Sequence, residues 1–205
     1  MRQDLHFWLT IMARGFVALL TGSAILIVPD LARTILLLPI ALAVAITGLA
    51  AYGVVDSVLV FVSSFMVESA RARIALLVQG CVGMVVGLLL LSVVYDHVQL
   101  KWFLSLAAAQ ALCAGVAETV VARHAGDRPI GRWNYTTAAI AFAFSVLYGY
   151  LRVQADALTP RTLSWSVYAY LVAFGIAECI TAARMLYANE HSIARRPSAG
   201  TKQRA

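Results

Sequence analysis

Long apolar stretches, separated by short polar breaks, follow one another through the whole chain. Spanning a bilayer as a helix takes roughly 20 apolar residues. Six stretches are long enough or nearly so, and we place them at residues 8–28, 34–56, 74–94, 102–122, 134–153 and 163–187. They are rich in Ala and Leu and lack the strict two-residue alternation of membrane barrel strands. The pattern therefore predicts an all-α integral membrane protein with six transmembrane helices.

A short motif of glycine, two apolar or small residues and an acid occurs three times, each time late in an apolar stretch. The copies are Gly53-Val54-Val55-Asp56, Gly115-Val116-Ala117-Glu118 and Gly175-Ile176-Ala177-Glu178, spaced 62 and 60 residues apart. A fixed period of this size is typical of a duplicated structural unit. We therefore predict three helical-hairpin repeats, at about 8–62, 73–122 and 132–187. Because each has an even number of spans, the three share one orientation in the membrane.

The repeats fill a single six-span domain, residues 1–189, and leave a polar tail at 190–205 that we expect to be disordered. Within the domain, glycines recur in the first helix of each repeat. Small residues let helices approach closely in lipid, so we predict helix-packing roles for Gly15, Gly22, Gly80, Gly83, Gly87 and Gly149. The glycines of 74–94 and the alanines of 102–122 suggest that these two helices pack tightly together. Pro39 is expected to kink the second helix.

Composition and charge predict that the chain lies in a membrane and on which side its termini are. It is 61% hydrophobic and 13% charged, with a mean hydropathy of +0.82, whereas soluble domains have about 25% charged residues. The bilayer is therefore the expected partner. With six crossings, twelve basic residues lie on the side of both termini and four on the other, which predicts cytoplasmic termini in a bacterial inner membrane. The net charge of +6 is split among helix ends, so we expect no nucleic-acid partner.

The three motif acids, Asp56, Glu118 and Glu178, are the candidate functional residues. An ionisable group at the bilayer centre costs about 2.5–3.5 kcal/mol on insertion scales and usually faces the protein interior. Two interpretations stay open. In the favoured one, each acid locks its hairpin by pairing with an arginine at the start of an odd-numbered helix; the candidate partners are Arg14, Arg73 and Arg132. In the other, the acids form a ring that handles protons or cations.

Nothing in the sequence indicates an enzyme. It contains no Gly-rich phosphate loop, no HExxH and no nucleophile elbow. Cys81, Cys113 and Cys179 all lie in apolar stretches without the spacing of a zinc site. We therefore expect no catalytic residues, no metal and no cofactor.

The glycine spacing, the Pro29-Asp30 break after the first helix and the closing acid motif together resemble the HdeD-like membrane family, over about residues 10 to 187. That family is built from two-helix repeats and was named for an acid-resistance membrane protein of enteric bacteria. The resemblance implies a non-enzymatic, six-span inner-membrane protein linked to acid or general stress. The third repeat departs from the pattern, because Phe142 replaces a glycine and no proline follows its first helix.

Three functions stay open at this point. The first is the HdeD-like stress role, or association with other membrane proteins or with further copies of the chain. The second is an accessory subunit of a larger membrane complex. The third is a small proton or cation channel or transporter that uses the three repeated acids.

Overall fold

The computed structural model describes residues 2–33, 39–67, 69–95, 100–125 and 129–194. Within these ranges the chain is helical, without strands, as the sequence predicts. The helices are α1 (Arg2–Arg33), α2 (Pro39–Ser64), α3 (Ala70–Tyr95), α4 (Leu100–Ala125), α5 (Pro129–Val153) and α6 (Pro160–Ala194), with one 3-10 turn, η1 (Ala155–Ala157), before α6.

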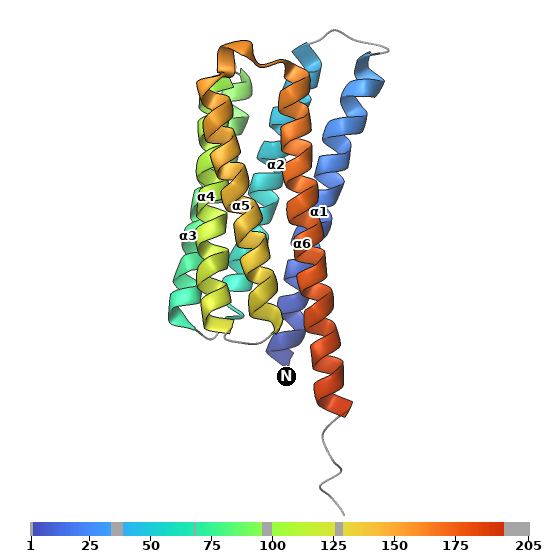
Figure 1. Cartoon of the computed structure of the whole chain (residues 1–205), viewed down its shortest axis with the longest axis vertical. Helices are drawn as coiled ribbons and strands as arrows, with labels where there is room; N and C mark the ends of the chain where they lie inside the picture. Colours follow the sequence, from blue (N-terminus) through green and yellow to red (C-terminus); the bar gives the residue numbers. More distant parts are fainter. Residues whose placement is uncertain (1, 34–38, 68, 96–99, 126–128, 195–205) are drawn as a thin grey trace, which may run out of the picture.

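The six helices stand side by side in one bundle (Figure 1). Each packs against its neighbours in sequence, and α1 packs against α6, so that the order closes into a ring. The most extensive contacts join α2 to α3, α4 to α5 and α1 to α6. The start of α1 and the end of α6 lie at the same end of the bundle, called the termini end below; the opposite end is the far end (Figure 1).

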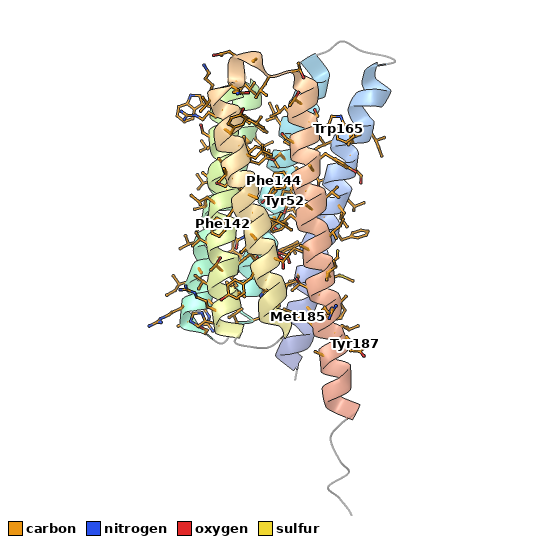
Figure 2. All side chains as sticks on the ribbon, viewed as in Figure 1. Tyr52, Phe142, Phe144, Trp165, Met185 and Tyr187 are labelled. Carbon is orange, nitrogen blue, oxygen red and sulfur yellow. The ribbon has the colours of Figure 1, made fainter. Side chains whose placement is uncertain are left out.

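The outside of the bundle is apolar along its length. Each of the six helices contains a segment long and apolar enough to cross a membrane. Large apolar side chains face outwards, among them Phe16, Val146 and Val153, which are 60%, 74% and 81% exposed. The exposed aromatic rings of Trp165 and Tyr187 lie on α6, Trp165 towards the far end and Tyr187 towards the termini end (Figure 2), as aromatic belts require. These features indicate a multi-pass membrane protein.

Several predicted helix boundaries are wrong. Helix α1 continues through Pro29 to Arg33, so there is no break at 29–30. Pro39 does not kink α2 but begins it, at a position where the missing N–H has no intrahelical partner to lose. At the other end of the chain α6 runs to Ala194, so the first residues of the expected tail are helical, while 195–205 lie outside the described residues.

The end of α2 matters most for the site. The sequence prediction ended this helix at Asp56. In the structure it continues for eight more residues, to Ser64. At 1.5 Å per residue this places Asp56 about 12 Å from the helix end. The acid is therefore well inside the bundle and not at its surface.

The glycines of α1 and α3 do pack against neighbouring helices. Those of α3, however, face a different helix from the one predicted. A Cβ on Gly15 would lie 2.8 Å from the Gly175 carbonyl oxygen of α6, and one on Gly22 3.2 Å from Leu171 Cβ, also of α6. The glycines of α3 face α2: Gly80 lies against Phe61, Gly83 against Ser57 and Gly87 against Val54. The predicted glycine-based packing of α3 on α4 is therefore wrong.

Helices α4 and α5 solve the same packing problem with different residues. The motif glycine of α4, Gly115, leaves room for the ring of Phe142, which a Cβ at Gly115 would meet at 3.0 Å. Phe142 thus fills the space that glycine leaves, which accounts for its departure from the repeat pattern. The packing role predicted for Gly149 is wrong, because a Cβ there would meet nothing within 4 Å.

Candidate functional site: one buried arginine and three acids

The motif places its glycine and its acid on the same side of a helix, because residues three apart are neighbours on a helix surface. Gly115 lies against α5 and Gly175 against α1, the next helices of the ring, whereas Gly53 lies nearest to Gln110 of α4 and also close to Gly87 of α3. All three acids are buried. The exposed fractions are 8% for Asp56 on α2, 5% for Glu118 on α4 and 2% for Glu178 on α6. Arg14 on α1 is 2% exposed and is the only basic residue among the described buried ones.

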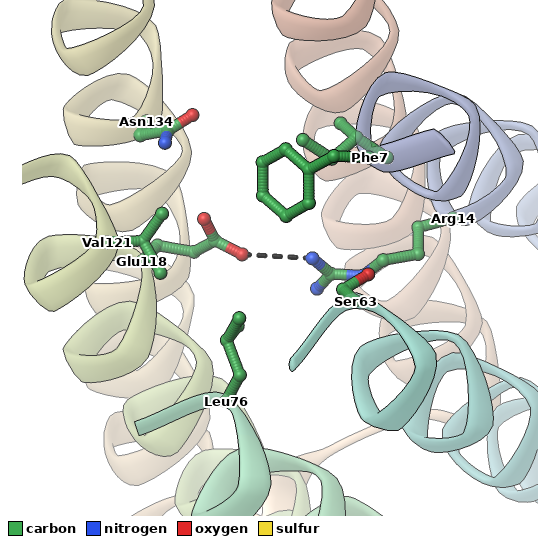
Figure 3. A pocket seen from close by; sticks show the side chains of 8 residues that line it. Phe7, Arg14, Ser63, Leu76, Glu118, Val121 and Asn134 are labelled. Atoms are coloured by element: carbon green, nitrogen blue, oxygen red, sulfur yellow. Dashed lines mark hydrogen bonds and ion pairs between the residues drawn. The ribbon is translucent and has the colours of Figure 1, made fainter. Parts of the chain in front are cut away.

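All three acids converge on this one guanidinium. Arg14 Nε donates to Asp56 Oδ1 at 2.8 Å, and Arg14 Nη1 donates to Glu118 Oε1 at 3.0 Å. Glu178 Oε1 lies 3.5 Å from the same Nη1. Figure 3 shows Glu118 reaching from α4 across to Arg14 on α1. The guanidinium carbon also lies 5.7 Å from the centre of the Phe174 ring, within the range of a cation–π contact.

The sequence predicted a separate arginine for each acid, whereas in the structure all three acids share Arg14. Arg73 is exposed and donates to the Val67 carbonyl oxygen at 3.2 Å, because it lies in the first turn of α3, close to the termini end. The side chain of Arg132 lies outside the described residues. Arg14 lies well inside α1, at the depth of the acids, and arginine presents five donors in a rigid fork. One side chain can therefore serve three carboxylates.

Two small cavities border this cluster, which we define as Arg14, Asp56, Glu118 and Glu178. Each has a volume of about 10 Å³, the room that one water molecule needs. The first lies towards the termini end and is lined by Phe7, Ser63 and Asn134, together with Arg14 and Glu118 (Figure 3). The second is lined on its polar side by Asp56, Ser57, Gln79, Gln110, Tyr52 and Tyr170.

Sequence reasoning missed the amide and tyrosine side chains around the acids. Gln79 is 6% exposed, and its Oε1 has no hydrogen-bond partner among the described atoms. Arg14 Nη2 is buried without one too. A signal for Gln79 was present, because it precedes Gly80 as Arg14 precedes Gly15 in the first repeat.

The polar interior is confined to one half of the bundle. The buried polar and charged side chains that the structure describes run from Thr10 and Asn134 near the termini end to Gln79 and Glu178 near mid-depth. Towards the far end the fully buried side chains are large and mostly apolar, such as Ile25, Leu90 and Phe103, although the phenol of Tyr148 is also buried there. Aromatic rings stand between the two halves: Phe174, Tyr170 and Phe144 follow one another with centroids 5.7 and 5.1 Å apart, and Figure 2 shows Phe144 and Tyr52 near mid-height.

The described residues contain no group of three or more His, Cys, Asp or Glu side chains that could hold a metal ion. Fold and site together define a class: a six-helix membrane bundle with a charge cluster buried in one half. Comparisons with protein-family models, curated proteins and solved structures find no match to the chain.

Proposed function

We propose that this chain is a non-enzymatic, multi-pass protein of the bacterial inner membrane, of the HdeD-like type, which supports the membrane during acid or other stress. The observation that carries the proposal is the cluster in which Arg14 binds Asp56, Glu118 and Glu178. It ties four helices together in a part of the membrane where a broken ion pair is costly. A bundle held together in this way should resist the separation of its helices.

The same cluster supports an arrangement of three parallel hairpin repeats about a common axis. Arg14 belongs to the first repeat, and its three partners belong one to each repeat. The most extensive helix contacts, α2 with α3, α4 with α5 and α6 with α1, each join one proposed hairpin to the next. In the contacts of α4 with α5 and of α6 with α1 the motif glycine lies against the neighbouring helix, whereas Gly53 of α2 lies nearest to Gln110 of α4.

The proposed orientation places the termini end in the cytoplasm. Arg71, Arg73 and Arg123 are exposed near that end, whereas Lys101 and Arg152 are exposed near the far end. A fluorescent-protein fusion at the C-terminus should be bright and an alkaline phosphatase fusion there inactive. The reverse result would overturn the orientation.

The size of the cavities favours a non-catalytic role over transport or catalysis. The cavities beside the cluster are about 10 Å³, against roughly 300–1,000 Å³ for a typical small-molecule site. A channel is also less well supported than the stress role, because the interior of the far half is apolar.

The proposal is tested in cells from which the gene has been deleted. Loss of the protein should lower survival after an acid shock, and the wild-type chain and the Asp156→Asn variant should restore it. Arg14→Met should restore it less well at equal membrane abundance. Equal survival with and without the protein in acid, osmotic and detergent stress would overturn the stress role. A stoichiometric partner in mild-detergent purification would indicate an accessory subunit instead.

A further inference from the structure

The charges of the cluster do not balance. Arg14 contributes one positive charge, and Asp56, Glu118 and Glu178 contribute three negative charges when ionised, which leaves a formal charge of −2. All four residues are at least nine-tenths buried, inside apolar spans. In such surroundings an unbalanced carboxylate is neutralised rather than left charged. Two further positive charges are therefore needed.

The groups around the cluster offer hydrogen bonds but no such charge. Among the described side chains, α2 and α6 add the neutral phenols Tyr52 and Tyr170, α3 adds the amide of Gln79, and α5 adds the amide of Asn134. The orphan Gln79 Oε1 is an acceptor beside the same cavity as Asp56. A protonated carboxyl group or a water molecule would supply the donor that it lacks.

Among the described residues, polar surroundings continue from the cluster towards the termini end. The cavity lined by Phe7, Ser63 and Asn134 lies between the cluster and the termini end, and a site this polar and roomy can hold a water. The next cavity towards the far end is lined by Leu49, Ala107, Gln110, Tyr148 and Tyr170. Beyond it, the described buried side chains are mostly apolar, such as Ile25, Leu90 and Phe103. A proton can therefore reach the acids from the termini end, whereas the described interior of the far half consists mostly of apolar side chains.

We propose that the cluster is a one-sided proton-binding site that holds two exchangeable carboxyl protons at neutral pH. Each proton comes from water at the termini end and adds to one carboxylate, so that the cluster carries no net charge. No electron is transferred, and no bond is formed or broken other than to the proton. The inference does not depend on the stress role proposed above.

Infrared spectroscopy of the purified full-length protein in nanodiscs tests this directly. At neutral pH the wild-type spectrum should contain a protonated-carboxyl C=O band that shifts in D₂O. Each single variant, Asp56→Asn, Glu118→Gln or Glu178→Gln, removes one negative charge and should halve the band. Any two of these changes together leave Arg14 with one carboxylate, and the band should vanish. Asp156→Asn, at an 87% exposed carboxylate, should leave it unchanged.

Other results would contradict the proposal. Absence of the band from the wild-type protein at neutral pH would overturn the proposal. A band that appears only when choline replaces sodium would assign the missing charge to a metal cation and not to protons. In liposomes loaded with a pH-sensitive dye, the protein should carry no proton flux above empty vesicles; flux abolished by Glu178→Gln would overturn the one-sided access.

Discussion

Replacing Arg14 by Met removes the one guanidinium that the three motif acids share. Its Nε and Nη1 hydrogen bonds of 2.8 and 3.0 Å are lost together, and the buried negative charge that it balances is left without a countercharge. Removing one partner of a buried ion pair costs about 3–5 kcal/mol. We expect Arg14→Met to lower the free energy of unfolding by about that amount, a large part of the 5–15 kcal/mol that typically holds a protein folded.

Two further variants separate charge from packing. Arg14→Lys keeps the charge but places it on one compact ammonium, which cannot reproduce both arms of the fork, so we expect a smaller loss of about 1.5–3 kcal/mol. The fourfold variant Arg14→Met with Asp56→Asn, Glu118→Gln and Glu178→Gln removes all the charges. Replacing a whole buried ion cluster by neutral groups is often neutral or stabilising, so this variant should recover most of the loss.

The assay is equilibrium unfolding in mild detergent, read by circular dichroism at neutral and at acidic pH. The deficit of Arg14→Met should shrink as the pH falls, because protonation removes the negative charge that lost its partner, whereas the fourfold variant should show no such trend. Stability of Arg14→Met within about 0.5 kcal/mol of wild type, the range of an inert surface change, would refute the reasoning. A fourfold variant as unstable as Arg14→Met would show that packing, for instance against Phe174, matters more than charge.

Three other predictions use the same unfolding assay. Gly15→Ala should destabilise by about 1–3 kcal/mol, because its Cβ would lie 2.8 Å from a backbone oxygen of α6; the matched control Gly149→Ala, which meets no atom within 4 Å, should be neutral or stabilising by up to about 1 kcal/mol. Gly115→Ala should be destabilising alone and less so combined with Phe142→Leu, and strictly additive effects would disprove the contact between them. Asp156→Asn should cost no more than about 1 kcal/mol, since this carboxylate and its lysine partner are 87% and 56% exposed; a larger loss would mean that the far-end contact between α4 and η1 is structural.

The sequence was a good guide wherever a rule depends on one stretch of chain. Apolar length alone predicted the six helices, and the repeated motif led to the three acids. Boundaries were less well predicted, because a helix that continues beyond its apolar segment, as α2 does to Ser64, gives little local signal. Pro39 shows the same limit: a proline is read as a kink or as a start depending on where the chain turns.

The partners of the repeated residues could not be predicted in this way. Whether the glycines of α3 face α2 or α4 depends on how α3 is rotated about its own axis, and the pattern of small residues fits both.

Arginine pairing is the sharpest case. Spacing and membrane side made Arg14, Arg73 and Arg132 equivalent candidates, and the sequence by itself determined only that three acids and several arginines share one half of the membrane. The tertiary structure decided that Arg14 alone, among the described buried residues, supplies the positive charge for all three acids. The physical reason is depth: closing α1 onto α6 carries Arg14 into the interior at the level of the acids, whereas Arg73 stays in the first turn of α3, at the surface of the bundle.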